Sequence, residues 1–149
     1  MENVAQVLER KGYEIFTVDP EAKVYEALEI MSEKEVGALL VLSGQNVVGI
    51  FSERDYARKV VLLGKSSKDL PVKNIMSTRI YYVTPEQSIE DCMNILIQKR
   101  IRHLPVLKDN KLLGVVSIGD IVKALLGEKE FIIDQLVHYI SGTASVGGN

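Results

Sequence analysis

The sequence of 149 residues has little cysteine, no long apolar run and no excess of charge of one sign. Its single cysteine, Cys92, excludes an internal disulfide and is typical of a reducing compartment. No apolar run approaches the roughly 18 residues that a membrane span requires, and the first residues lack the apolar segment of a secretory signal. The net charge of −2, with acids and bases mixed along the chain, argues against a nucleic-acid-binding surface. The sequence therefore predicts a cytoplasmic protein that binds neither nucleic acid nor membrane.

The residue patterns of common catalytic and metal sites are also absent. Gly64-Lys65-Ser66 lacks the glycine five residues earlier that a phosphate-binding loop needs, because that position is Lys59. No G-x-G-x-x-G segment follows a strand, and the two histidines have no metal-ligand spacing with the cysteine. No serine or cysteine is placed with a histidine and an acid as a nucleophile would be. We therefore predict no enzymatic activity, no catalytic cofactor and no metal.

What the sequence does contain is an internal repeat. Shifting the chain by 65 residues aligns it with itself without a gap from about Ile15 to Lys59, so that Pro20 falls on Pro85 and Gly49 on Gly114. The apolar positions between the identities agree as well. A repeat of this length sets the architecture before any single motif does.

Each copy predicts the order β-α-β-β-α, which gives an α+β fold with small mixed sheets. An opening strand at 14–18 or 79–83 precedes a helix whose apolar positions recur at i, i+3, i+4 and i+7. Two apolar strands joined by hairpin residues follow in each copy, and then a second helix. These strand pairs are predicted at 38–42 with 47–51 and at 103–107 with 112–117, and the second helices at 53–63, ended by Gly64, and at 118–126, ended by Gly127.

The repeat also sets the predicted boundaries of the units. We predict a first repeat with a short lead-in helix over residues 4–66 and a second, also with a lead-in helix, over 72–128. A separate C-terminal helix is predicted over 129–141 and a flexible tail over 142–149. The apolar residues of the C-terminal helix are expected to pack on the body or on another subunit.

Both copies contain a glycine, two apolar residues, a serine and, three residues later, an aspartate. Ser52-x-x-Asp55 and Ser117-x-x-Asp120 match a helix capping box. A cap does not require the preceding glycine, whose missing side chain admits a ligand or another part of the backbone. A helix N-terminus favours anions, and a carboxylate in the first turn can accept both hydroxyls of a ribose. Helix capping and contact with a ribonucleotide are compatible interpretations.

The two motifs, the strand–proline–helix openings and IRHLPVL at 101–107 resemble a tandem pair of cystathionine-β-synthase (CBS) domains, often called a Bateman module. The resemblance covers about residues 4–139. It implies two β-α-β-β-α repeats related by a pseudo-twofold axis, with clefts between them that bind adenosine compounds such as AMP, ADP, ATP, NAD or S-adenosylmethionine. It also implies a homodimer packed through the repeat helices into a flat disc.

The resemblance further implies roles for particular residues. Backbone groups of 36–38 and of 101–103 would flank adenine, Thr84 would lie near the ribose and base, and Arg102 and His103 would hold phosphate. Arg54 and Arg58, four residues apart on one helix face, can reach the same anion, although a solvated helix face explains them as well. For His103 the alternative is an ordinary strand-edge histidine. The candidate ligand-binding residues are Asp19, Val36, Gly37, Ala38, Ser52, Arg54, Asp55, Arg58, Thr84, Ile101, Arg102, His103, Leu104, Ser117 and Asp120.

The sequence therefore predicts a non-enzymatic regulatory or sensor module that binds an adenine ribonucleotide (AMP, ATP or NAD). Binding would be coupled to conformation or assembly. The alternative is a structural or protein-interaction module with vestigial clefts. Asp19 stands where the family has threonine, and Gly119 stands at the position that Arg54 occupies in the first copy, so two identical sites are not expected. The sequence indicates no particular regulated protein partner.

Overall fold

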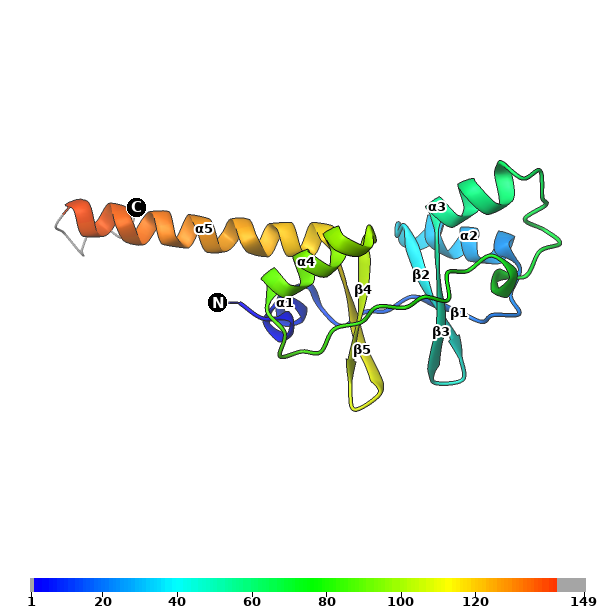
Figure 1. Ribbon diagram of the computed structural model, residues 1–149, viewed down its shortest axis with the longest axis horizontal. Coiled ribbons are helices and arrows are strands. Elements are labelled where there is room, and N and C mark those ends of the chain that lie inside the picture. The colour runs from blue at the N-terminus through cyan, green and yellow to red at the C-terminus, as the bar shows by residue number, and fades with distance from the viewer. Residues whose placement is uncertain (1, 142–149) are drawn as a thin grey trace.

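The computed structural model describes residues 2–141 of the chain, and the predicted flexible tail at 142–149 lies outside them (Figure 1). The first repeat holds a mixed sheet in which β1 runs parallel to β2 and β2 antiparallel to β3. Helix α2 precedes the hairpin, and α3 with a five-residue π-helix follows it. The elements are β1 (Thr17–Val18), α2 (Val24–Lys34), β2 (Ala38–Ser43), β3 (Asn46–Ser52), α3 (Glu53–Tyr56) and the π-helix (Ala57–Val61).

The second repeat has the same order, so the prediction of an α+β fold with two repeats is confirmed. Its elements are α4 (Ile89–Lys99), β4 (His103–Lys108), β5 (Lys111–Ser117) and α5 (Ile118–Ser141). The predicted strand at 79–83 is wrong, because only Val83 pairs with β4, in a single parallel bridge to Val106. In the first repeat Leu40 donates its N–H to Phe16, but Pro105 stands at the equivalent position and has no N–H to donate.

The two predicted helix ends after the motifs have different outcomes. Gly64 adopts a left-handed φ of 69° beyond the π-helix, at the predicted end of that segment. The predicted end at Gly127 is wrong, because α5 continues without a break to Ser141, so that residues 129–141 form its second half. A glycine inside a helix costs only about 1 kcal/mol relative to alanine, and the strong helix formers on both sides of Gly127 offset this cost.

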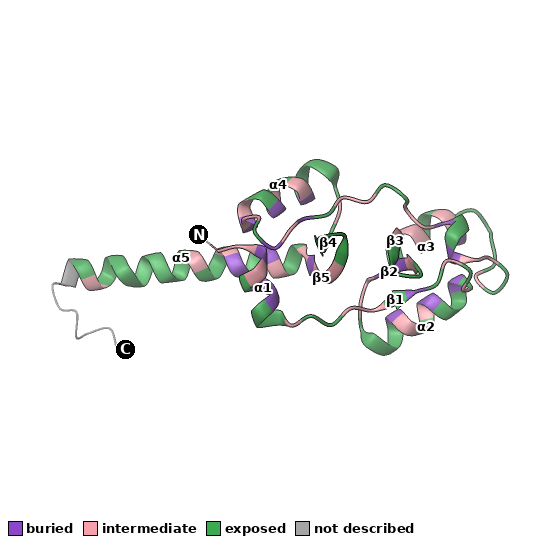
Figure 2. Ribbon diagram, turned by 90° about the horizontal axis from the view of Figure 1, so that it is seen from below, coloured by how far each residue is buried: buried purple, intermediate pink, exposed green. Residues whose placement is uncertain are grey.

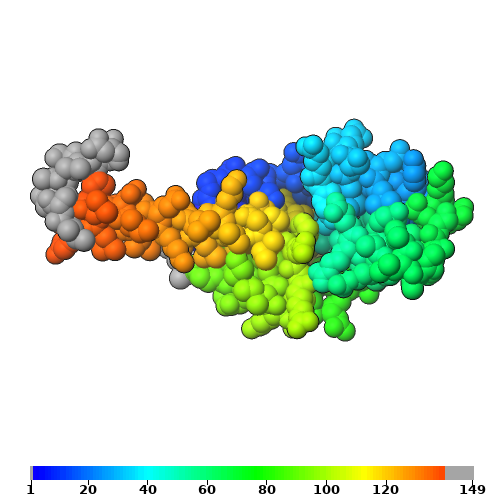
Figure 3. Space-filling model, turned by 90° about the horizontal axis from the view of Figure 1, so that it is seen from above, coloured from blue at the N-terminus to red at the C-terminus, as the bar shows by residue number. Residues whose placement is uncertain are grey.

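The two lead-in segments are exchanged between the repeats. Helix α1 (Val4–Lys11) precedes the first repeat, yet Val4, Val7 and Leu8 are buried in the core of the second (Figures 1 and 3). The short 3₁₀ helix Val72–Asn74 precedes the second repeat, yet it packs into the core of the first. The sequence boundaries 4–66 and 72–128 stay a prediction, whereas in space each core is completed by the lead-in segment of the other copy.

This exchange explains the repeated glycine of the two motifs. A Cβ on Gly49 would overlap Sδ of Met76, beside the exchanged 3₁₀ helix, and would lie 3.1 Å from the carbonyl oxygen of Ser77. A Cβ on Gly114 would lie 2.9 Å from Cδ2 of Leu8 on α1. Neither glycine lines a cavity between the repeats. The glycines therefore make room for the exchanged segments, not for a ligand.

Figure 2 shows that the buried residues gather within the two repeats, while the second half of α5 is exposed along its length. One cluster of buried side chains belongs to each repeat. Within residues 2–141, no helix combines the length and apolar character needed to cross a membrane.

Candidate functional site

The larger cavity, of about 450 Å³, lies between the two repeats and is called the first cleft here. The first repeat contributes the N-terminal end of α3 and the π-helix, which follow directly from the end of β3. The second repeat contributes residues 79–81 and 99–103, at the end of α4 and the start of β4. The two repeats therefore have to keep their relative position for this cleft to keep its shape.

Both capping boxes are formed. In the first copy the Asp55 N–H donates to Ser52 Oγ at 3.2 Å, and the Ser52 N–H donates back to Asp55 Oδ2 at 3.0 Å. In the second copy the matching distances between Ser117 and Asp120 are 3.1 Å and 2.8 Å. The capping interpretation of the motif is therefore confirmed in both repeats, and each carboxylate is held in place at a helix start.

Cationic side chains dominate the first cleft. Its lining includes seven arginines and lysines but only two acids, Glu53 and Asp55. The cations are Arg54, Arg58, Lys59, Arg79, Lys99, Arg100 and Arg102. They come from both repeats, and Arg54 also donates to the carbonyl oxygen of Arg100 at 3.3 Å. Such a concentration of guanidinium and ammonium groups favours a ligand with several negative charges.

The Asp55 carboxylate lies at the floor of this cationic cleft. Its Oδ1 lies 3.3 Å from Lys59 Nζ and accepts a hydrogen bond from Ser77 Oγ at 3.4 Å. Lys59 also donates to the carbonyl oxygen of Ile75, in the exchanged lead-in segment. The Asp55 side chain is 13% exposed and both of its oxygens already have partners, so a ligand hydroxyl has to share or replace one of them.

A smaller cavity of about 380 Å³, called the second cleft here, also lies between the two repeats. Many of its lining residues are related to those of the first cleft by the repeat shift of 65 residues. Its only lysine or arginine is Lys11, and it includes two acids, Glu14 and Glu35. These acids stand where the first cleft has Arg79 and Arg100, and Gly37 stands in place of Arg102. The two clefts therefore share a backbone plan but have opposite charge.

Lys11, on the exchanged helix α1, binds to residues of the second motif. Its Nζ lies 2.6 Å from Asp120 Oδ2 and donates to the carbonyl oxygen of Val115 at 2.8 Å. Burial would raise the pKa of Asp120, but the hydrogen bonds from Lys11 and Ser117 and the charge of Lys11 outweigh it and lower the pKa. The carboxylate equivalent to Asp55 is therefore used to fasten α1 to the second repeat.

We expect Asp120→Ala to lower the free energy of unfolding by about 1–2 kcal/mol at pH 7, because it removes the capping acid and the partner of Lys11. Since the pKa of Asp120 is lower in the folded state, this stabilisation is present above the unfolded pKa of about 3.9 and is lost as the pH falls through the folded pKa. Urea unfolding of wild type and variant at pH 7 and below pH 4 measures it. A difference that does not shrink at the acidic pH would contradict the role of the charge.

His103 lies at the start of β4 and lines both clefts. Burial lowers the pKa of its imidazole, and the nearby charges of Lys11 and Arg102 lower it further, against the opposing effect of Asp120. The ring is therefore neutral at pH 7.

The structure brings most of the predicted residues to one cleft or the other. The first cleft is lined by Gly37, Ala38, Ser52, Arg54, Asp55, Arg58, Ile101, Arg102 and His103. The second is lined by Val36, Gly37, Ala38, His103 and Ser117. Asp120 does not line the second cleft itself but binds Lys11, which does.

Besides Asp120, three predicted residues line neither cavity. Leu104 alternates to the inner face of β4, is 0% exposed and belongs to the core of the second repeat. Asp19 accepts the N–H of Glu21 in the turn before α2. Thr84 donates its backbone N–H to the side chain of Gln87 in the equivalent turn. Asp19 and Thr84 thus form hydrogen bonds within the turns that precede α2 and α4.

Several cleft residues were missed by the sequence argument. Lys99 and Arg100 directly precede the predicted segment 101–104, and Arg79 and Tyr81 lie in the opening segment of the second repeat. A comparison of charge across the repeat shift would have found Arg79 and Arg100, which align with Glu14 and Glu35. Lys99 Nζ lies 5.1 Å from the centre of the Tyr81 ring, and Lys34 takes the same position over Phe16 in the first copy. Lys11 has no such signal, because its place depends on the exchange of α1.

Across the described part of the chain, residues 2–141, no cluster of three or more histidine, cysteine, aspartate or glutamate residues is arranged to hold a metal ion. Cys92 is buried against the core of the second repeat, and burial with the nearby charge of Asp91 raises its pKa to about 11. The thiol is therefore protonated at neutral pH and packs as a small apolar side chain.

Comparison with known proteins supports this architecture. Residues 4–62 and 72–127 each match the family model of the CBS domain. The chain is 41% identical over 124 residues to the CBS domain-containing protein CBSX3, mitochondrial, of Arabidopsis thaliana. That match covers 80% of the present chain and 60% of the plant protein, so the chain spans less than two thirds of the length of this relative.

Solved structures with the same architecture extend the comparison. A protein with CBS domains from Burkholderia ambifaria superposes with a TM-score of 0.82 at 47% identity, covering 85% of this chain and 95% of that one. A hexameric CBS-CP12 protein from bloom-forming cyanobacteria superposes with a TM-score of 0.73 at 30% identity, covering 81% of this chain and 70% of that one. The paired repeats are thus also found in a protein that assembles as a hexamer.

Proposed function

Because the chain belongs to the CBS domain family, whose paired domains are generally regulatory and ligand-binding, we propose that it is a non-enzymatic module that binds one adenine ribonucleotide in the first cleft. AMP, ATP and NAD are the candidate ligands. Binding changes conformation or assembly, and this change is the output of the module.

The observation that carries the proposal is the set of seven cations around the Ser52–Asp55 capping box. In this proposal Arg54, Arg58 and Arg102 bind the phosphates, since guanidinium groups form paired hydrogen bonds with phosphate oxygens. Asp55 accepts the hydroxyls of the ribose. The backbone of 37–38 and of 101–102, at the cleft wall, flanks the adenine.

The second cleft supports a stoichiometry of one nucleotide per chain. Its acids, Glu14 and Glu35, repel phosphate, and its aspartate is already paired with Lys11. The second motif therefore has a structural role in this proposal. This same observation favours the alternative candidate, a protein-interaction module, if the first cleft also fails to bind a nucleotide.

The distribution of the cations explains how binding can be coupled to conformation. Arg54, Arg58 and Lys59 belong to the first repeat, whereas Arg79, Lys99, Arg100 and Arg102 belong to the second. Without an anion the two groups repel one another across the cleft, and a bound phosphate chain attracts both. A ligand thus stabilises the arrangement in which the repeats lie closest. We further propose that the chain acts in the cytoplasm as a homodimer.

The proposal is tested by thermal shift and calorimetry on protein stripped of ligand. The panel is AMP, ADP, ATP, NAD, NADH, S-adenosylmethionine, GMP and deoxy-AMP. A ligand that binds only the folded state raises the melting temperature. We expect a shift for an adenine ribonucleotide, a smaller one for deoxy-AMP, and one site per chain. No shift at millimolar concentration, with an intact fold, would reject nucleotide binding and favour the interaction module.

We expect nucleotide binding to tighten as the pH falls from 7.5 to 5.5. The pKa of His103 is lowered in the free protein, and a phosphate in the first cleft raises it, so binding takes up a proton. NAD is the suitable probe because its phosphates do not titrate in this range. The affinity should rise by about three- to tenfold and by less in His103→Gln, as measured by calorimetry. An equal rise in both proteins would contradict a role for His103.

A further inference from the structure

The second half of α5 extends away from the two repeats (Figures 1 and 2). The helix has 24 residues and is therefore about 36 Å long. Its fully buried positions, Ile121 and Ala124, lie near its start, on the body of the second repeat. From Leu126 onward, the large apolar side chains that the structure describes are between 54% and 86% exposed: Leu126, Phe131, Ile132, Ile133, Leu136, Val137 and Tyr139.

The exposed apolar surface of α5 is large for a monomer. Its exposed apolar side chains together carry on the order of 1,000 Å² around the helix, of which those that share the face of Leu126 and Ile133 account for about 600 Å². The largest apolar patch of a typical monomer is about 300–600 Å², and a stable protein interface takes about 600–1,000 Å² from each partner. A single projecting helix of this length is also only marginally stable in water without packing. This face is therefore just large enough for one side of a dimer interface.

The exposed apolar residues form a continuous stripe from the body to the projecting half. Ile118, Val122, Leu126, Ile133 and Val137 follow one another at intervals of four or seven residues, and Leu136 lies three residues after Ile133, so they share one face of the helix. Helix α4 packs beside the start of α5, and its Ile97 is 62% exposed. The stripe thus offers both a projecting half and a place on the body that a projecting half can cover.

We propose that this stripe is a dimer interface in which the α5 helices of two copies of the chain pack antiparallel. The projecting half of each helix, with Ile133, Leu136 and Val137, covers Val122, Leu126 and Ile97 of the other copy. This interface is isologous, as in a twofold dimer. It rests on the homodimer proposed above but is independent of nucleotide binding, and it adds the projecting half of α5 to the repeat helix α4 and the first half of α5.

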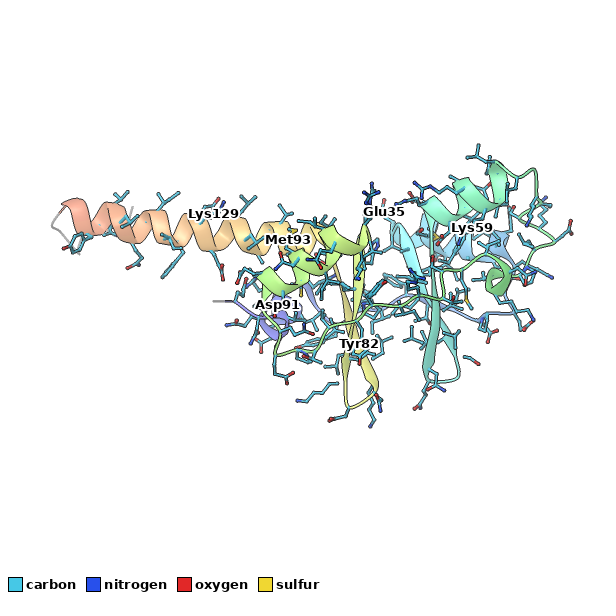
Figure 4. The ribbon with its side chains drawn as sticks, viewed as in Figure 1. Glu35, Lys59, Tyr82, Asp91, Met93 and Lys129 are labelled. Atoms are coloured by element: carbon cyan, nitrogen blue, oxygen red, sulfur yellow. The ribbon has the colours of Figure 1, made fainter. Side chains whose placement is uncertain are left out.

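One charged residue lies within the stripe. Lys129, labelled on the projecting half of α5 in Figure 4, lies between Leu126 and Ile133 at the spacing of the stripe. Antiparallel packing with Ile133 against Leu126 of the other copy places the two Lys129 residues near the twofold axis, where their long side chains can extend to water at the edge of the interface. The antiparallel orientation itself follows from the exposed positions on the body that each projecting half covers.

The first test is the oligomeric state of the full-length protein by sedimentation and light scattering. We expect a dimer, and Ile133→Glu should weaken it at least about 100-fold, because the charge enters the centre of an apolar interface. Gln135→Glu introduces the same charge on another face of α5 and should leave the dimer intact. A monomeric wild type would overturn both this interface and the homodimer. A dimer that survives Ile133→Glu would overturn this interface alone.

The second test fixes the orientation by cross-linking. Leu126→Cys and Leu136→Cys proteins, when mixed and oxidised, should form disulfides between the two variants but few within either one. Cys92 is buried and does not compete. Disulfides within each variant alone would show parallel packing and overturn the proposal. The nucleotide panel applied to Ile133→Glu reports the first cleft separately, so failure of nucleotide binding is not confused with failure of the interface.

Discussion

Replacing both Arg54 and Arg102 by glutamine is expected to weaken the binding of NAD or ATP at least about 100-fold. Each arginine lines the first cleft, one from each repeat, and Arg54 is already held close to the second repeat by the carbonyl oxygen of Arg100. A hydrogen bond to a charged group contributes about 1.5–3 kcal/mol, so two of them correspond to about two to four orders of magnitude in affinity. Calorimetry with the purified variant measures the loss.

Two comparisons show whether the loss comes from contact with phosphate. Adenosine, which has no phosphate, should bind the variant and the wild type alike. Lys123→Gln removes a cation from α5 at the position equivalent to Arg58, outside both clefts, and should leave the affinity for NAD within about twofold. Equal losses for adenosine and NAD would show that the arginines support the shape of the cleft and do not bind phosphate.

The positive charge of the first cleft could be predicted in part from the sequence. Arg54, Arg58 and Arg102 were predicted, because Arg54 lies in the repeated motif, Arg58 four residues further along the same helix, and Arg102 in the segment 101–104. The difference between the clefts also lies in the sequence, since Glu14 and Glu35 align with Arg79 and Arg100 under the repeat shift. Such a comparison shows which of two related sites retains a charge. It cannot show that either site exists, because that depends on how the two repeats meet.

The helices and hairpins were predictable because their signals are local. Apolar residues at helical spacing gave α2 and α4, and apolar runs joined by hairpin residues gave the four main strands. The predicted strand at 79–83 was wrong because its pairing depends on a residue distant in the sequence. Pro105 has no N–H, whereas Leu40 donates its N–H at the equivalent position of the first repeat. The helix end predicted at Gly127 was wrong because the residues around this glycine favour a helix more strongly than one glycine disfavours it.

The exchange of the lead-in segments could not be predicted, because no local pattern reports which of two similar cores a short helix joins. The sequence of α1 offers apolar side chains that either repeat could bury, namely Val4, Val7 and Leu8. The repeated glycine was the available signal, since a motif glycine without a turn indicates close approach of another segment. The sequence left open whether a ligand or the chain itself makes that approach, and the contacts of Gly49 and Gly114 show that the chain does.

The exchange itself predicts a large effect on stability. Leu8→Ala is expected to lower the free energy of unfolding by about 2–5 kcal/mol, because Leu8 is 1% exposed in the core of the second repeat. Gly114→Ala alone should cost about 1–3 kcal/mol, since its Cβ would lie 2.9 Å from Cδ2 of Leu8. Denaturant unfolding of the two single variants and the double variant measures whether the effects are coupled.

In the double variant Leu8→Ala/Gly114→Ala, the new methyl group occupies part of the space that Leu8 leaves. We therefore expect the double variant to be more stable than the sum of the single effects predicts, by at least about 1 kcal/mol. Leu8→Ala/Gly49→Ala is the matched control, because Gly49 contacts Met76 in the other core, and its effects should add. Additive effects in the first pair would mean that α1 does not pack on Gly114. Loss of α1 from this core would also release Lys11 from Asp120, so the same contact that fixes the fold keeps the second cleft closed to anions.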